Sequence, residues 1–182
     1  MQPINLIGPR VIVRDMIADD IPLWYTWYWE SNPEMTTCRP FTRKPIEQVV
    51  EHVKEHFEKR DVIFLAVRRR NDDEFLGRLT LFNLNERNHS IEVGYMIGPP
   101  YRRQGFTREA LALILPYLFE QENINKVTAQ TGAFNQPSLA LLEHFGFQLE
   151  GRLRQHHWYN GVLYDDLLYS LLAAEYGTRP AT

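Results

Sequence analysis

The stretch Tyr101–Ala110 places a single glycine among arginines, between an apolar strand-like run and a long helical run. Gly105 can adopt left-handed backbone at low cost, so we expect a tight turn there. The N–H groups of such a turn, together with the N-terminus of the following helix, can bind phosphate groups. Arg102, Arg103 and Arg108 offer charge-assisted donors for the same ligand. We therefore predict a phosphate-binding turn, although neither G-x-G-x-x-G nor G-x-x-x-x-G-K-[ST] occurs in the chain.

The hydrophobic pattern predicts the elements that hold this turn. Three short β-rich runs separated by polar turns indicate an antiparallel meander, at 62–67, 75–82 and 91–97. A helix is expected from about Gly105 to Glu120, where Pro116 should remove a hydrogen bond and kink the helix. A strand follows at 126–131. Because a helix connects the two, this strand should be the parallel neighbour of the run at 91–97.

The outer elements follow from the same patterns. A strand at 11–14 and helices at 21–29 and 45–59 should precede the meander. Pro137 should open a short helix that ends before Gly146. Asn160-Gly161 between alternating aromatic runs is a strong hairpin signal, which predicts paired strands at 152–159 and 162–172.

Composition limits the class of protein. The chain has 182 residues, enough for one domain with a sizeable core, and its net charge of −3 gives no basic field for nucleic acid. The cluster Arg68–Arg70 is followed at once by acidic residues. Cys38 is the single cysteine, so an internal disulfide is excluded. No apolar run approaches the roughly 20 residues of a membrane-spanning helix. We expect a cytoplasmic protein that binds neither nucleic acid nor membrane.

The turn also carries a resemblance to a known family. The stretch Ile91–Ala110 resembles the acetyl-CoA motif of GNAT acetyltransferases, [QR]-x-x-G-x-[GA]. Arg102 matches its first position and Gly105 its central glycine, whereas Thr107 departs from the usual final Gly or Ala. Downstream, the segment 135–147 resembles the N-x-x-S…E-x-x-G-F block of the RimJ/RimL-like branch, the ribosomal-protein acetyltransferases. Asn32-Pro-Glu34 and the hairpin that ends in Asp165 also fit that branch, so the resemblance covers nearly the whole chain.

The resemblance implies a fold. We expect one domain over residues 1–182, of mixed α/β (α+β) class, whose tail after about residue 176 is frayed. Its central sheet should be mostly antiparallel and splayed between two parallel strands, with helices on both faces.

The resemblance also implies roles for matching residues, with acetyl-CoA as co-substrate. The turn amides would hold the CoA diphosphate, those of Arg103, Gln104, Gly105, Phe106 and Thr107. The side chain of Thr107 should alter packing slightly without abolishing binding. The amides of Met96 and Ile97 would pair with the pantetheine arm like an added strand, and one of them could polarise the thioester. Asn135 would bind the cofactor arm, and Ser138 would protonate the departing thiolate.

Glu92 is the best candidate for a base or a water-orienting carboxylate. It alternates with Ile91 and Val93 and so projects to one face of a strand beside the cofactor. An amine with a pKa near about 10 must lose a proton before it attacks, and a carboxylate can assist directly or through water. A solvated glutamate on a strand is the alternative. Asp165 and Tyr159 are weaker candidates that fit a structural role equally well.

Cysteine and histidine give little support for covalent or metal chemistry. We find no histidine at a suggestive spacing from Cys38, and a lone cysteine is more often inert. His52 and His56 match the H-x-x-E-H string, yet they share the charged face of a helix. His156 and His157 are adjacent on a strand, so they should point to opposite faces and not bind one metal ion. We predict that no metal is required.

These observations together predict transfer of an acetyl group from acetyl-CoA to a primary amine, by direct attack in a ternary complex. The acceptor is left open between a protein N-terminus and a small amine such as a polyamine, amino sugar or antibiotic. Three tryptophans at Trp24, Trp27 and Trp29 either wall the acceptor pocket or combine core packing with a homodimer contact. The alternative function is a non-catalytic acyl-CoA-binding sensor module.

Overall fold

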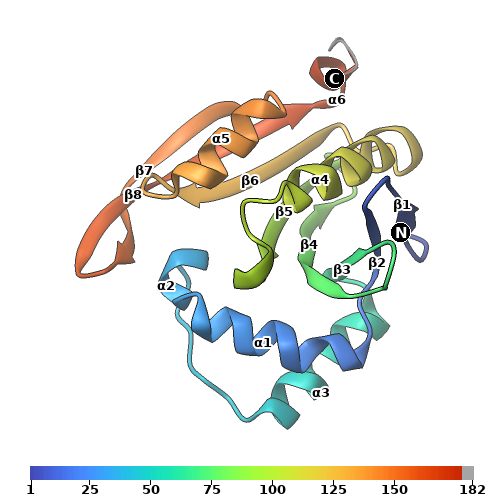
Figure 1. Cartoon of the computed structure of the whole chain (residues 1–182). Helices are drawn as coiled ribbons and strands as arrows, with labels where there is room; N and C mark the ends of the chain where they lie inside the picture. Colours follow the sequence, from blue (N-terminus) through green and yellow to red (C-terminus); the bar gives the residue numbers. More distant parts are fainter. Residues whose placement is uncertain (178–182) are drawn as a thin grey trace.

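A computed structural model of the chain describes residues 1–177. Within that range the strands form one sheet of eight, in the order β1-β2-β3-β4-β5-β6-β8-β7 (Figure 1). Their bounds are β1 Asn5–Ile7, β2 Val11–Asp15, β3 Ile63–Arg69, β4 Phe75–Asn85, β5 Ser90–Ile97, β6 Lys126–Gly132, β7 Gln148–Tyr159 and β8 Val162–Leu172. Neighbouring strands are antiparallel except for β5 and β6, which are parallel as predicted. The predicted frayed tail lies outside the described residues, which end at Gly177.

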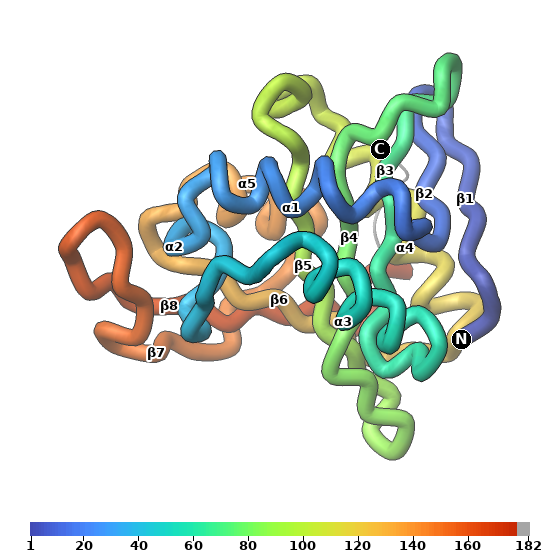
Figure 2. Tube along the Cα trace, turned by 90° about the horizontal axis from the view of Figure 1, so that it is seen from below, coloured from blue at the N-terminus to red at the C-terminus, as the bar shows by residue number. Residues whose placement is uncertain are grey.

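Helices cover both faces of this sheet. Figure 1 shows α4 and α5 on one face and α1 and α3 on the other, and Figure 2 shows α1 and α3 crossing in front of β3 to β5. The helices are α1 Ile21–Glu30, α2 Pro33–Thr36, α3 Ile46–Lys59, α4 Phe106–Pro116, α5 Gln136–His144 and α6 Ala173–Tyr176. The predicted α/β class and layering are therefore confirmed. In this part of the chain no helix combines the length and the apolar character that a bilayer crossing requires.

Two of the three tryptophans of α1 belong to the core on its face of the sheet, whereas Trp29 is half-buried. Trp24 and Trp27 are buried, and the Trp27 ring stacks on Phe75 of β4 with 5.6 Å between ring centroids. The Trp27 ring also lies where a Cβ on Gly98 would come within 2.5 Å of it, so α1 packs closely on the end of β5. The homodimer contact stays a prediction.

The sheet opens between β5 and β6. Their pairing covers Ser90 to Glu92 of β5, whereas β6 pairs with β8 from Lys126 to Gly132. The β5 residues from Val93 to Ile97 thus keep β4 as their neighbour on one side and, in the described range 1–177, have no strand on the other. Figure 1 shows the two halves of the sheet diverging at this point. This is the predicted splay, and it places unpaired backbone beside the arginine-rich turn.

Three local features refine the sequence-based expectations. The α-helix at 106–116 ends at Pro116, and a π-helical turn at Tyr117–Gln121 continues it, because proline has no N–H to donate. Strand β1 was not expected, since three residues are too few to show a pattern. Positive φ angles at Gly146 (76°), Asn160 (49°) and Gly161 (82°) confirm the helix end and the hairpin turn.

Candidate active site

The arginine-rich turn presents a row of unpaired backbone donors. Arg103 and Gly105 have φ angles of 63° and 82°, and α4 starts at the next residue, Phe106. The first bond of the helix runs from the Glu109 N–H to the Gly105 carbonyl, at 3.0 Å. Among residues 1–177, no acceptor is found for the six consecutive N–H groups from Arg103 to Arg108. Consecutive free amides at a helix N-terminus form an anion-binding site.

A residue that the sequence did not indicate lies beside this turn. Arg10, in the β1–β2 connection, donates from Nη1 to the Gln104 carbonyl at 3.1 Å, and its guanidinium lies 5.1 Å from the centre of the Phe106 ring. Glu109 holds it there, because the Glu109 carboxylate accepts from both the backbone N and Nε of Arg10. The Arg10 side chain remains 52% exposed, so it can also reach a bound anion.

The predicted arginines of the turn do not behave alike. Arg102 donates from Nε to the Ile97 carbonyl at 3.1 Å and from Nη2 to the Ser31 hydroxyl, so its guanidinium joins the turn to β5 and to the end of α1. All three arginines are exposed, but within residues 1–177 only Arg102 of the three forms side-chain hydrogen bonds. The charge expected for a diphosphate is therefore offered by these two and by Arg10, with Arg102 holding the turn in place.

Two hydroxyl groups meet at the splay. Asn135 caps α5 and accepts from the Ser138 N–H at 3.4 Å, as an N-cap side chain does. The hydroxyl of Ser138, which is buried, lies 2.8 Å from the hydroxyl of Tyr95 on β5. Burial raises the pKa of Tyr95 to about 12, and the hydrogen bond with Ser138 offsets only part of that rise. Both groups therefore stay protonated near neutral pH and can donate. Tyr95 was missed by the sequence reasoning, although alternation along β5 places it with Val93 and Ile97.

Glu92 lies on the other face of β5. It pairs with Phe82 of β4 and Thr128 of β6, at the last point where β5 and β6 are joined. Its Oε2 accepts from Asn83 Nδ2 at 2.8 Å, and the residue is half-buried. Alternation puts Glu92 and Met96 on the α1/α3 face and Tyr95 on the α4/α5 face. The candidate base and the candidate acid are thus separated by the sheet.

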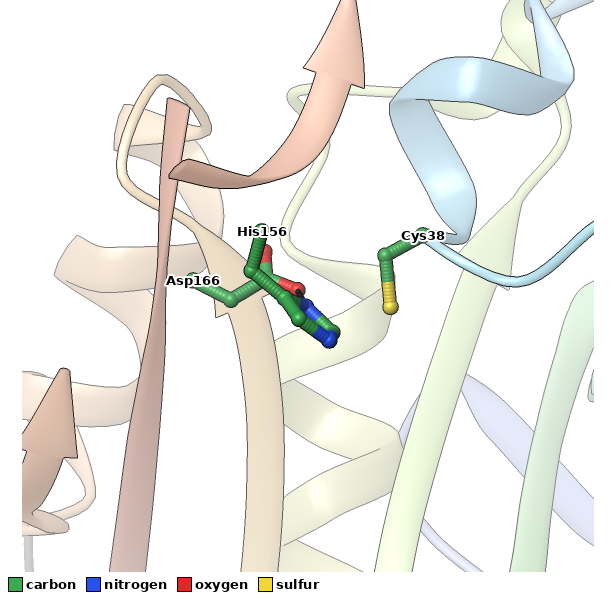
Figure 3. Close-up of side chains that lie close together, drawn as sticks. All are labelled: Cys38, His156 and Asp166. Carbon is green, nitrogen blue, oxygen red and sulfur yellow. Dashed lines mark hydrogen bonds and ion pairs between the residues drawn. The ribbon is translucent and has the colours of Figure 1, made fainter. Parts of the chain in front are cut away.

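A polar cluster on the far side of the splay corrects two predictions. Cys38, His156 and Asp166 offer ligand atoms that all lie within 4.8 Å of one another (Figure 3). Cys38 therefore does have a histidine neighbour, which spacing along the chain could not reveal. The prediction that His156 and His157 face opposite ways is also wrong, because both Nδ1 atoms bond Asp166, at 3.0 and 2.8 Å. A register shift in β7 with φ of 50° at Gln155 turns His156 inward.

Hydrogen bonds satisfy this cluster. The Asp166 side chain is 1% exposed and also accepts from Gln130 Nε2 at 2.7 Å. Burial alone would raise the pKa of Asp166, but its bonds to His156, Gln130 and His157 outweigh burial and lower that pKa. Burial and the nearby Asp166 raise the pKa of the Cys38 thiol, which disfavours the thiolate needed for attack or for metal binding. The cluster has the donor types of a metal site, yet both Asp166 oxygens already have partners.

One nitrogen of the cluster is free to react. His156 donates from Nδ1 to Asp166, so in the neutral ring Nε2 carries the lone pair. Nε2 has no partner in the described part of the chain, and the side chain is 46% exposed. By contrast, His157 bonds the Glu34 carbonyl through Nε2 and Asp166 through Nδ1, so both of its ring nitrogens already have partners.

The weaker candidates have structural partners. Asp165 accepts from Arg152 at 2.8 Å and from the Gln155 N–H at 2.9 Å, which supports the irregular segment of β7. The Tyr159 ring stacks on Phe134 with 4.2 Å between centroids. A role in stabilising the hairpin accounts for both.

Comparison with known proteins decides the family. The model of the family described as "Acetyltransferase (GNAT) domain" matches residues 10–148. This chain belongs to the GNAT acetyltransferase family. It is 31% identical to the uncharacterized N-acetyltransferase p20 of Bacillus licheniformis over 180 residues, which cover 94% of this chain and 98% of p20.

Solved structures support the fold of this GNAT protein. Spermidine N-acetyltransferase from Vibrio cholerae, solved with CoA and spermine, superposes with a TM-score of 0.85 at 20% identity. The superposition covers 94% of this chain and 100% of that enzyme. Mycobacterium smegmatis RimJ, solved with CoA-disulfide, gives 0.78 at 23% identity, with coverage of 96% and 91%. The family match and the similarity to the N-acetyltransferase p20 make the protein an acetyl-CoA-dependent N-acetyltransferase, and acetyl-CoA is its co-substrate.

A hollow on the α1/α3 face lies next to Glu92 in this acetyltransferase. Its volume is about 480 Å³, and its lining consists of Arg39, Asp61, Val62, Thr80, Phe82, Asn83 and Leu84. Asn83 is also the residue that bonds Glu92. The hollow thus connects the candidate base with the segment that follows α2.

Proposed function

We propose that this acetyltransferase moves the acetyl group of acetyl-CoA to a primary amine by direct attack in a ternary complex. The observation that carries the proposal is the row of unpaired N–H groups from Arg103 to Arg108, next to the unpaired edge of β5. In this proposal the diphosphate binds those N–H groups, and the pantetheine arm runs along Met96 and Ile97. Asn135 contacts the arm near its thioester end.

The two faces of the sheet then divide the proton transfers. Tyr95 and Ser138 supply a proton to the departing thiolate from the α4/α5 face. Glu92 receives a proton from the amine on the α1/α3 face, directly or through water. His156, fixed by Asp166 and with Nε2 free, is a second candidate for that proton. Cys38 takes no covalent part, because its thiol is held protonated.

We further infer that the chain lies in the RimJ/RimL-like branch. Residues of the matching motifs support this, since they meet in the structure. Asn32, at the start of α2, donates from Nδ2 to Oδ1 of Asn160 in the β7–β8 turn at 3.3 Å, and the Glu34 carboxylate accepts from the Asn160 N–H at 3.0 Å. Branch membership and the acceptor are separate questions, because sites on one fold serve many acceptors.

An assay of thioester consumption tests the proposed function. Acetyl-CoA is incubated with the protein and a panel of amines: peptides with free N-termini, spermidine, an amino sugar and small amino acids. Free CoA is measured with a thiol reagent, and the acetylated amine is measured by mass. We expect free CoA and acetylated amine in equal amounts. Binding of acetyl-CoA without release of CoA would instead favour a sensor module.

A further inference from the structure

Arg78 is a partly buried cation in the middle of the sheet. It lies on β4, where it pairs with Ala66 of β3 and Met96 of β5. Its guanidinium carbon is 3.8 Å from the centre of the Trp24 ring and 5.0 Å from that of Phe64. These contacts place the charged group between α1 and the sheet, on the same face as Glu92.

Among the described residues, no anion is paired with this guanidinium. Nη1 of Arg78 is buried, and in residues 1–177 it has no hydrogen-bond partner. Other arginines of the chain bond carboxylates, among them Arg10, Arg60, Arg68, Arg69 and Arg152. The titratable group that acts on its charge is Tyr28, whose pKa burial raises, so that it stays neutral. Burial lowers the pKa of Arg78 to about 9, which is the expected response to an unpaired buried charge.

The aromatic contacts do not replace an anion. A ring that lies on the face of a guanidinium attracts the positive charge, but the N–H groups point outward in the plane of the guanidinium. Nη1 therefore still requires an oxygen acceptor. The indole Nε1 of Trp24, the ring that covers Arg78, is likewise buried and has no acceptor among the described residues.

The position of Arg78 connects it to the acceptor side of the reaction. Met96, its neighbour on β5, is where the pantetheine arm is proposed to run. Thr80, the next residue of β4 on the same face, lines the hollow of about 480 Å³. Of the carboxylates nearby, Asp61 bonds His56 at 2.7 Å and Glu92 bonds Asn83. Arg39 adds positive charge to the hollow.

We propose that Arg78 binds an acidic group of the acceptor, so that the acceptor is a small amine carrying a carboxylate or a phosphate. This inference rests on the proposed acetyl transfer, and it makes a polycation a poor acceptor. The guanidinium edge offers the paired N–H geometry that both carboxylate and phosphate oxygens accept. The hollow beside it supplies room for the rest of a small molecule.

Matched acceptor pairs test the proposal. The pairs are β-alanine against β-alanine amide and phosphoethanolamine against ethanolamine, with spermidine and a C-terminally amidated neutral peptide as further acceptors. We expect kcat/KM to be at least tenfold higher for the acidic member of one pair, and the pair that shows it distinguishes carboxylate from phosphate. A carboxylate raises the pKa of the neighbouring amine, so less of that amine is in the neutral, reactive form. A preference for the acidic member therefore cannot come from amine ionisation.

The variant Arg78→Met separates charge from packing, because methionine keeps an apolar chain against Trp24. It should abolish the preference through a raised KM for the acidic member, with about twofold or less change for the neutral member. Arg87→Met, which removes an exposed arginine from the β4–β5 connection, is the control and should keep the preference. The proposal is wrong if the wild-type enzyme shows no preference for the acidic member in either pair, or if it prefers spermidine or the amidated peptide. It is also wrong if Arg78→Met retains the preference. The wild-type comparison stands even if Arg78→Met fails to fold.

A binding measurement distinguishes this proposal from the proposed function. β-Alanine and phosphoethanolamine are titrated into the protein without acetyl-CoA, and tryptophan fluorescence reports binding beside Trp24. Saturable binding that Arg78→Met removes, without acetyl transfer to any amine, would support the anion site and contradict the transfer. Acetyl transfer at equal rates to acidic and neutral amines, without such binding, would support the transfer and contradict the anion site.

Discussion

The two sides of the splay are built in different ways. On the proposed cofactor side, the donors are backbone N–H groups from Arg103 to Arg108, fixed by one turn and one helix start. On the proposed acceptor side, the candidate groups are side chains from β4, β5 and β7, with Arg78, Glu92 and His156 among them. A backbone site tolerates sequence change, because every residue type except proline has an N–H. A side-chain site changes with each substitution, so acceptor specificity can diverge while the cofactor is kept.

The largest expected effect is on proton removal at the acceptor side. Glu92→Gln and His156→Gln each remove one candidate proton acceptor, and loss of the true one should lower kcat by roughly 10²-fold or more. The pH–rate profile of each variant identifies it, because the acidic limb of the profile should disappear only with the true base. Cys38→Ala is the control and should keep its rate. Equal, small effects of both glutamine variants would mean that water alone takes the proton.

The next effect concerns stability on the acceptor side. Asp166→Asn removes the charge that its three donors share, which should cost about 2–4 kcal/mol of unfolding free energy at neutral pH. The folded pKa of Asp166 is lowered, so its contribution is present above the unfolded pKa of about 3.9 and is lost as pH falls through the folded value. The difference between wild type and variant should therefore shrink below about pH 4. Denaturant unfolding at several pH values measures it, and a constant difference would contradict an ionised Asp166.

Gly105 in the proposed cofactor turn has a matched control in Gly161 of the β7–β8 hairpin. Gly105 and Gly161 both have φ of 82°, and neither would place a Cβ closer than 3.4 Å to another atom. Valine at either position should cost about 1–3 kcal/mol of stability through backbone strain. Only Gly105→Val should also weaken CoA binding, by roughly tenfold or more, since charge-assisted bonds to the diphosphate are lost. Calorimetric titration with CoA decides, and equal affinities in the two variants would remove the turn from the site.

The smallest expected effect is at the paired hydroxyls. Ser138→Ala and Tyr95→Phe should each lower kcat by about tenfold, with unchanged affinity for CoA. Because the two hydroxyls are bonded, the double variant should lose less than the product of the single effects. Ser170→Ala, which alters a buried serine on β8, controls for packing. Fully multiplicative losses would show that the two hydroxyls act independently.

The sequence predicted the fold more completely than the site. Periodicity located the major strands and helices, and the motif around Gly105 located the turn. The sequence reasoning missed Tyr95, since its partner Ser138 is 43 residues away and on another element. It also misjudged His156 and His157, because a regular strand was assumed where β7 has an irregular register. Arg78 gave no signal either, since an arginine in a strand is ordinary until its surroundings are known.

The sequence alone determined the backbone features, namely the turn at Gly105, the helix starts, the Asn160-Gly161 hairpin and the crossover that makes β5 and β6 parallel. Such features depend on the conformational limits of a few consecutive residues, which the residue types reveal. Only the tertiary structure decided which side chains face one another across the splay. Those contacts join residues far apart in the chain, and their partners follow from sheet register, strand irregularity and the packing of α1 on β4.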